Sequence, residues 1–262
     1  MKIASWNINS IRARMENLIS WLEASRPDVV LLQEIKCQDE QFPQALLEDL
    51  GYNIAVFGQK TYNGVAILSK RPLEDIQRGI PREKGREESR YLEAVTGNVR
   101  VASIYVPNGQ SVGTEKFYEK LDFFKGLKTH VDHLLSYGEK IVLGGDYNVA
   151  PTDYDVYDPQ KFQNKLLVSP AERAAFSDLI QAGLIDGLRQ KFPENTSDNT
   201  QLYTWWDYRQ GGFSRNHGFR LDHLLLSSQA ALVLKDIGID RAIRAQVRPS
   251  DHAPIWCELG VD

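Results

Sequence analysis

Polar residues that could bind a metal ion or a phosphate follow four strongly apolar segments, at the points where predicted buried strands end. In chain order they are Asn7 and Asn9, Glu34, Tyr105, and Asp146 and Asn148. Strand ends are where open α/β folds build their sites. Carboxylate and amide oxygens are the ligands that Mg²⁺ and Mn²⁺ prefer, whereas no Cys/His group has zinc spacing. These residues therefore predict a site for a hard divalent cation.

Two later segments reverse this order, because the acid comes before the apolar run. Asp222 precedes the run 224–226, and Asp251-His252 precedes Ile255-Trp256. An aspartate beside a histidine can orient the imidazole or keep it charged. A phosphate that gains charge in the transition state would be stabilised by a metal, an imidazole and several amides around one point. A carboxylate without metal contact could take a proton from water. If all these groups converge, the last two strands run opposite to the first four, which favours a mixed sheet over a parallel barrel or a Rossmann sheet.

Each of these patterns also has an ordinary structural explanation. Asn-x-Asn after a strand usually forms a turn, and so does Gly144-Gly145-Asp146. A glutamate that ends a strand is usually on the surface, and Asp-His before a proline is usually a local hydrogen-bonded pair. It is their joint occurrence in one chain that favours a catalytic site.

The elements that would position these residues are predicted from apolar runs and helical periodicity. Strands are expected near residues 2–6, 29–32, 52–57, 64–68, 91–95, 99–106, 141–143, 221–226 and 255–259. Helices are expected from Ser10, as N-cap, to Leu22, and over 40–50, 115–135 and 170–182. Three long polar segments, 76–90, 150–168 and 194–218, are expected to form the rim that grips the substrate.

Composition sets the class of protein. The chain has 262 residues, of which 42% are hydrophobic and 25% charged, as in a globular enzyme rather than a disordered or disulfide-built chain. No apolar run approaches the ~20 residues that span a bilayer, and no leader pattern opens the chain. Two cysteines fit a reducing cytosol. We therefore expect one domain over 1–262, in the cytoplasm and without a membrane. The net charge of −4 alone argues against a DNA-binding protein.

The ordered motifs change that last expectation. They are Trp6-Asn7-Ile8-Asn9, Leu32-Gln33-Glu34, Tyr105-Val106-Pro107-Asn108, Gly144-Gly145-Asp146-Tyr147-Asn148, Arg220-Leu221-Asp222-His223 and Ser250-Asp251-His252-Ala253-Pro254. Over nearly the whole chain, the sequence resembles the exonuclease III family of abasic-site DNA endonucleases, in the endonuclease/exonuclease/phosphatase superfamily. The resemblance implies a four-layered α/β sandwich, in which two mixed β-sheets pack face to face with helices outside. It also implies Mg²⁺-dependent hydrolysis of DNA 5′ to abasic sites, often with 3′-phosphodiesterase, 3′-phosphatase and 3′→5′ exonuclease activities.

The resemblance implies roles for the site residues. Glu34 would be the principal metal ligand, and Mn²⁺ a substitute for Mg²⁺. The implied metal-binding set is Asn7, Asn9, Glu34, Asp146, Asn148 and Asp251. The implied catalytic set is Tyr105, Asp146, Asn148, Asp222, Asp251 and His252. Asp146 would align or deprotonate the attacking water, or else bind a second metal. His252 would contact a phosphate oxygen, with Asp251 orienting the ring and Asp222 as its carboxylate partner. Position 9 is Asn where some relatives carry Asp, which lowers the negative charge of the site.

The segment 205–220 interleaves aromatic residues with cations, as expected of a DNA-binding surface. The resemblance places an abasic-sugar pocket at Trp205, Phe219 and Leu221, and Arg209 and Arg215 are the candidate phosphate contacts. Arg241, Arg244 and Arg248 form a second basic cluster. A third, Arg82, Lys84, Arg86 and Arg90, is interspersed with glutamates and is expected to be a solvated loop.

The expected partner is double-stranded DNA with abasic or 3′-blocked ends, bound by a monomer at the nucleoid. The cations are clustered in a few segments, and the acids are concentrated at the predicted metal site. The net charge of −4 therefore predicts modest, salt-sensitive binding to DNA. Alternatives are a superfamily member acting on a lipid or inositol phosphate, and a DNA-binding relative with an inactive site. The balance between endonuclease and exonuclease activity and the number of metals stay open.

Overall fold

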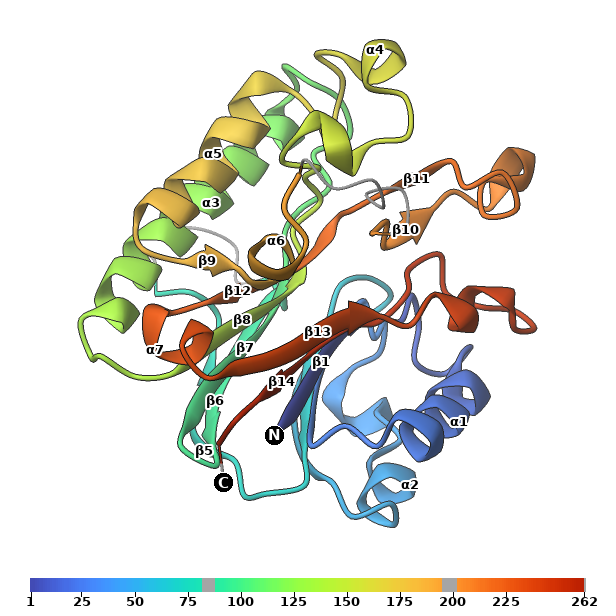
Figure 1. Ribbon diagram of the computed structural model, residues 1–262. Coiled ribbons are helices and arrows are strands. Elements are labelled where there is room, and N and C mark those ends of the chain that lie inside the picture. The colour runs from blue at the N-terminus through green and yellow to red at the C-terminus, as the bar shows by residue number, and fades with distance from the viewer. Residues whose placement is uncertain (82–87, 195–201, 262) are drawn as a thin grey trace.

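Two six-stranded mixed β-sheets pack face to face in the computed structural model, which describes residues 1–81, 88–194 and 202–261 (Figure 1). The first sheet has the order β13-β14-β1-β2-β4-β3, with bounds Leu234–Ile239, Ile255–Leu259, Lys2–Asn7, Val29–Gln33, Val65–Ser69 and Asn53–Phe57. The second has the order β5-β6-β7-β8-β12-β9, with bounds Glu74–Arg78, Tyr91–Thr96, Val99–Tyr105, Ile141–Asp146, Asp222–Leu226 and Ile185–Asp186. The four-layered sandwich is confirmed.

Strand directions agree with the prediction made from the order of acid and apolar residues. β1 runs parallel to β2 and antiparallel to β14. β7 runs parallel to β8, and β8 runs antiparallel to β12. The two segments in which the acid precedes the apolar run are therefore the reversed strands.

The central strands are buried on both faces, which explains their continuous apolar sequences. In β2, Val29 and Leu31 lie in the core between the sheets, whereas Val30 and Leu32 pack on the outer face. The Gly144-Gly145 pair is part of β8 and not a turn. A Cβ atom at Gly145 would lie 2.0 Å from the Ile104 carbonyl oxygen of β7, so this position requires glycine. A Cβ atom at Gly144 would lie 2.6 Å from Leu31 Cδ1 of the facing sheet and would displace that side chain.

Helices cover the two outer faces. α1 (Met15–Ser25) and α2 (Gln44–Glu48) lie on the first sheet, and α3 (Glu115–Leu135) and α5 (Pro170–Gln181) lie on the second (Figure 1). The described residues also form three short helices, α4 (Pro159–Phe162), α6 (Gly187–Lys191) and α7 (Ser228–Ala231). None of the helices described is both long and apolar enough to cross a membrane.

Two helix predictions were wrong in detail. The first helix starts at Met15 and not after Ser10, because Asn9 and Ser10 have positive φ and form a loop at the sheet edge. The predicted helix 40–50 is divided at Pro43 into a 3₁₀ turn, Asp39–Gln41, and α2.

The predicted rim segments have local structure of their own. Residues 150–168 contain a 3₁₀ turn at Asp153–Asp155 and α4. The segment 202–219 contains two short paired strands, β10 (Trp205–Trp206) and β11 (Gly218–Phe219), and the loop between them holds a 3₁₀ turn at Arg209–Gly211. A further 3₁₀ segment, Arg241–Ala245, lies later in the chain. Residues 82–87 and 195–201, including Arg82, Lys84 and Arg86, lie outside the described residues.

Candidate active site

The polar residues at the strand ends converge on one edge of the sandwich. In the second sheet, Tyr105 pairs in register with Asp146, and Asp146 pairs with Asp222, so three functional groups lie side by side. In the first sheet, Asn7 pairs with Gln33, the residue before Glu34. The site thus straddles both sheets, which is the convergence that the strand-end pattern predicts.

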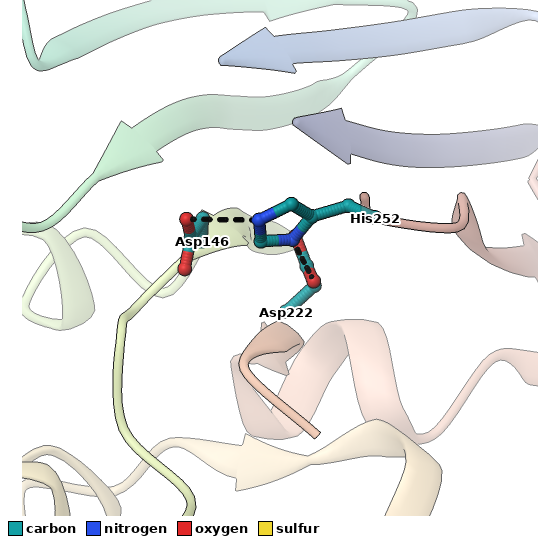
Figure 2. A group of neighbouring side chains, drawn as sticks. All are labelled: Asp146, Asp222 and His252. Atoms are coloured by element: carbon teal, nitrogen blue, oxygen red, sulfur yellow. Dashed lines mark hydrogen bonds and ion pairs between the residues drawn. The ribbon is translucent and has the colours of Figure 1, made fainter. Parts of the chain in front are cut away.

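A histidine lies between two carboxylates at the centre of this edge (Figure 2). His252 Nδ1 is 2.7 Å from Asp222 Oδ2, and His252 Nε2 is 3.7 Å from Asp146 Oδ2. Burial alone would lower the pKa of His252, but the charges of Asp222 and Asp146 outweigh it and raise the pKa to about 10. The ring is therefore an imidazolium at neutral pH, with Nδ1–H donating to Asp222.

Asp146 is a buried carboxyl group that accepts three hydrogen bonds from Asn7 and Asn148, one of them from Asn148 Nδ2 at 3.3 Å. Asn7 Nδ2 donates to its Oδ2 at 2.9 Å, and the Asn148 backbone N–H donates to its Oδ1 at 2.9 Å. Burial raises the pKa of Asp146 to about 7, against the opposing charge of His252. A carboxyl group with a pKa near the working pH is suited to accept a proton from water.

Asn7 connects the two sheets through its side-chain amide. Its Nδ2 donates to Glu34 Oε1 as well as to Asp146 Oδ2, both at 2.9 Å, and its Oδ1 accepts from the Asn9 backbone N–H at 3.0 Å. With both ends of the amide engaged, Asn7 orients the two carboxylates.

Two of the residues predicted to bind a metal, Glu34 and Asn9, present hard oxygen ligands to one positive charge. Lys36 Nζ lies 2.8 Å from Glu34 Oε2 and 2.6 Å from Asn9 Oδ1. The donor set at this point attracts a cation and consists of carboxylate and amide oxygens, so it fits a hard divalent ion. Lys36 was missed by the sequence reasoning, although its position two residues after Glu34 was a usable signal.

A second group of possible ligands is Asp146, Asp222 and His252, whose ligand atoms lie within 4.8 Å of one another. An imidazolium cannot coordinate a metal because both ring nitrogens carry protons. Asp222 Oδ1 is buried without a hydrogen-bond partner among the described residues, so part of this group could still accept a ligand. The Glu34 side of the site fits a metal better.

Asp251 does not hydrogen-bond to the His252 ring, contrary to the expectation that it orients the imidazole. Its Oδ1 accepts from Asn9 Nδ2 at 2.9 Å, and its Oδ2 accepts from Trp205 Nε1 at 3.0 Å. Burial opposes ionisation, but the His252 charge and these two bonds lower the pKa of Asp251. Asp251 therefore joins the metal side of the site to the aromatic side.

Tyr105 and Asn148 are the remaining predicted catalytic residues at this edge of the sandwich. Burial, then the charges of Glu34 and Asp146, raise the pKa of Tyr105 far above its usual value, so its hydroxyl stays a donor. Asn148 has a left-handed backbone (φ 51°), and its Nδ2 donates to Val106 O at 3.0 Å. Its Oδ1 accepts from the Asn108 side chain at 3.1 Å.

The three predicted pocket residues lie together beside His252. Trp205 pairs in register with Phe219, with ring centroids 5.6 Å apart, and Trp205 also forms a β-bridge with His252. Phe219 and Leu221 belong to a small apolar cluster, together with Ala150, Val156 and Val168. Phe219 and Leu221 are only 3% and 2% exposed, so of the three side chains Trp205 presents the accessible apolar surface here.

The predicted basic surface divides into exposed and buried arginines. Arg209 and Arg215 are exposed on the loop between β10 and β11, and Arg209 pairs with Asp207 at 2.8 Å. Arg220, however, is fully buried and bonds Asp155 at 2.6 Å and Asp186 at 2.7 Å.

The second basic cluster divides in the same way. Arg244 is buried, with its guanidinium over the rings of Tyr208 and Phe213, while Arg248 is exposed. The expectation that Arg220 and Arg244 belong to the DNA-facing cations was wrong, because both are internal groups that hold the rim in place.

Comparison with known proteins gives the family. The Endonuclease/Exonuclease/phosphatase family matches residues 4–252. Exodeoxyribonuclease III of Haemophilus influenzae is 38% identical, over 99% of this chain and 100% of that protein. The 3′ phosphatase NExo from Neisseria, solved with a product DNA hairpin, has a TM-score of 0.95 at 40% identity over 99% of both chains. An AP endonuclease from Archaeoglobus fulgidus has a TM-score of 0.94 at 33% identity over 100% of both chains. By sequence and by fold, this chain belongs to the Endonuclease/Exonuclease/phosphatase family and is a homologue of exodeoxyribonuclease III.

Proposed function

We propose that this protein is a DNA-repair phosphodiesterase that hydrolyses the backbone 5′ to abasic sites and removes blocking groups from 3′ ends. The observation that carries this proposal is the charged His252 held between Asp222 and Asp146, beside the apolar wall of Trp205 and Phe219. The names of similar proteins support it, since they include an exodeoxyribonuclease III, an AP endonuclease and a 3′ phosphatase.

The proposed role of each residue follows from the charge state of its side chain. Asp146, with a pKa of about 7, takes the proton of the attacking water. The His252 imidazolium and the Tyr105 hydroxyl donate to non-bridging phosphate oxygens, where charge develops. Asn148 holds the water or the phosphate. Trp205, Phe219 and Leu221 receive the abasic sugar, which costs little to expose because it has no base to unstack.

Mg²⁺ is the proposed cofactor, with Mn²⁺ as a substitute. Glu34, Asn9 and Asp251 would hold the ion: Glu34 and Asn9 present oxygen atoms to the Lys36 ammonium, and Asp251 Oδ1 is hydrogen-bonded to Asn9 Nδ2. A bound divalent ion would neutralise the charge that builds on the phosphate. The proposed partner is damaged double-stranded DNA, bound by a single-domain monomer in the cytoplasm, at the nucleoid. Light scattering and cell fractionation would test the last two points.

The test of function is a product profile on an abasic duplex, a 3′-phosphate nick, a matched 3′ end and a phosphoinositide, each with Mg²⁺ and with chelator. We expect Mg²⁺-dependent cleavage of the first two substrates and none of the lipid. Lack of incision by folded protein with Mg²⁺ present would rule out the proposal, and turnover of the phosphoinositide alone would favour a lipid phosphatase.

Two variants connect the activity to the site. We expect Glu34→Ala and His252→Ala to bind DNA but to lose about 10²-fold or more in cleavage rate, the usual effect of removing one group that stabilises transition-state charge. Matched controls are Glu119→Ala and His133→Ala, which remove the same residue types from exposed positions on α3. Wild-type cleavage by both site variants would contradict the assigned site.

A further inference from the structure

A fully buried lysine lies directly behind the candidate active site. Lys120, on α3, has no solvent exposure, and its ammonium has three acceptors. They are the backbone carbonyl of Asn148 at 2.6 Å, the backbone carbonyl of Asn108 at 3.2 Å, and Glu172 Oε1. An ammonium has three N–H donors, so its donor capacity is filled.

We propose that Lys120 is a positioning residue for the phosphodiesterase reaction: it fixes the turn that carries Asn148 and, through Glu172, connects this turn to the wall of the apolar pocket. The inference rests on the proposed function and extends it to a pair of residues outside the motifs. Neither residue faces the substrate, so any effect on the reaction passes through Asn148 and the pocket.

The turn at Asn148 is held from outside by two other residues. Asn148 has a φ of 51°, in the left-handed region, which asparagine tolerates better than most other residues with a side chain. Lys120 bonds its carbonyl from one side, while the Asn108 side chain bonds its Oδ1 at 3.1 Å from the other. Because Lys120 also bonds the Asn108 carbonyl, one ammonium holds both partners of this amide pair.

Glu172 carries the connection to the pocket. Its Oε1 accepts from the Leu167 backbone N–H at 3.0 Å, and its Oε2 accepts from the Ser169 hydroxyl at 2.6 Å. Leu167 has a φ of 73°, packs against the pocket cluster, and accepts from the Ala150 backbone N–H at 2.8 Å. The ion pair therefore holds two positions with left-handed backbone, Asn148 in the site and Leu167 against the apolar cluster.

A purely stabilising role would not require charges here. Apolar replacements of a buried ion pair are often equally stable or more so, whereas removal of one partner leaves an uncompensated charge. An apolar side chain at position 120 cannot donate a hydrogen bond to the Asn148 carbonyl. Replacing the charged pair therefore distinguishes a positioning role of Lys120 from a role in folding alone.

The test compares wild type, Lys120→Met, Lys120→Met/Glu172→Gln and the control Arg100→Met; the glutamine substitution removes the charge of Glu172 but keeps an acceptor for Leu167 and Ser169. Arg100 is also nearly buried in an ion pair, with Glu93, but lies at the opposite end of β7 from Tyr105. We expect the double variant to regain the melting temperature that Lys120→Met loses, while kcat on a 3′-phosphate nick stays about tenfold to 10²-fold below wild type in both, the scale of loss for a misplaced group. KM should change little, and Arg100→Met should keep its kcat.

A spectroscopic readout does not depend on activity. The ¹⁵N–¹H signals of the Asn148 and Asn108 side-chain amides should shift in both Lys120 variants and stay in place in Arg100→Met. Wild-type kcat and unshifted amide signals in the stable double variant would overturn the proposal. Failure of both Lys120 variants to fold would also overturn it, since the pair would then serve folding. Inactive wild type with the expected amide shifts would count against the proposed function alone.

Discussion

Two buried histidines of this protein have opposite charge states because of their neighbours. His252 is charged, since two carboxylates outweigh its burial. For His223, burial and then the Arg220 charge lower the pKa to about 4. Arg220 donates to His223 Nδ1 at 3.0 Å, so that nitrogen must be unprotonated, and Nε2–H donates to Val149 O at 3.0 Å. One ring is thus available to stabilise phosphate charge, and the other is a neutral bridge behind the pocket.

The Asp222→Asn variant tests the charge on His252. Without the Asp222 carboxylate, burial opposes the charged ring and we expect the pKa of His252 to fall well below about 10. A raised pKa contributes stability that is fully present below about pH 6.5 and is lost as the pH rises through about 10. The stability difference between wild type and variant should therefore shrink over that window.

An NMR titration of the His252 ring, together with unfolding at several pH values, makes this measurement. Asp186→Asn, which removes a carboxylate near His223 instead, is the control. Equal His252 titration in wild type and Asp222→Asn would exclude the Asp222 charge as the cause.

The partner of each histidine does not follow from local sequence, although the family resemblance implied Asp222 as the carboxylate partner of His252. Asp222-His223 and Asp251-His252 are both Asp-His pairs, and both suggest a bond between neighbours. In the structure Asp222 bonds His252, and Asp251 bonds Asn9 and Trp205. The crossing depends on β12 and the 250–252 turn meeting at one edge, which is a property of the tertiary fold. Residue types predicted the chemistry, and topology determined the pairs.

Among the elements, the segment 150–168 determines how closed the apolar pocket is. Val156 forms a β-bridge with Phe219, and the Tyr157 backbone N–H donates to Gly218 O at 3.1 Å. The Phe162 ring meets Phe219 edge to face, 4.9 Å between centroids. Phe219 retains only 3% exposure under this cover. The pocket wall therefore includes residues from a segment that carries no motif.

The Phe162→Ala variant tests whether this cover limits what the pocket accepts. Removing the ring should widen the pocket, so a nucleotide that keeps its base should enter more easily. We expect matched 3′-end digestion to rise about tenfold relative to abasic incision, near the low end of discrimination by pocket size. Leu232→Ala, at an exposed position far from the pocket, is the control. An unchanged ratio of the two activities would remove Phe162 from the specificity determinants.

Elements with strong hydrophobic patterns were the predictable part of the fold. The helix 115–135 and the buried strands agree with expectation, because their burial imprints a period on the sequence. β5 was not predicted, since it is a mostly exposed strand of polar composition. The β10–β11 hairpin was not predicted either, because two residues are too few to show alternation and their partners lie far along the chain.

At the scale of the whole molecule, charge is arranged by depth. Glu34, Asp146 and Asp222 gather at one edge of the sandwich, where the two sheets meet, whereas Arg209 and Arg215 are exposed on the neighbouring loop. An open groove lined in part by Arg12, Arg14 and Arg248 runs beside Tyr208. A net charge of −4 is therefore compatible with a cationic rim around an anionic centre.

The Arg209→Ala/Arg215→Ala variant should show how much of the DNA affinity comes from this rim. Each lost phosphate contact reduces the slope of log affinity against log salt by about one, so we expect a decrease of up to about two. Fluorescence anisotropy on an abasic duplex at several salt concentrations measures it. Lys128→Ala, on the outer face of α3, should leave the slope unchanged. Equal slopes in the double variant and wild type would place the DNA on another face.

The pairing of the first strand with the last has a consequence for how the protein is made. β1 lies between β2 and β14, and the Met1 carbonyl accepts from the Leu259 backbone N–H at 2.8 Å, so the two termini lie near each other (Figure 1). His252 and Asp251 are translated just before β14. A nascent chain on the ribosome already holds Glu34 and Asp146, yet it has neither its imidazolium nor the strand that closes the first sheet. The first sheet and the site at its edge can therefore be complete only once residues 251–259 have been synthesised.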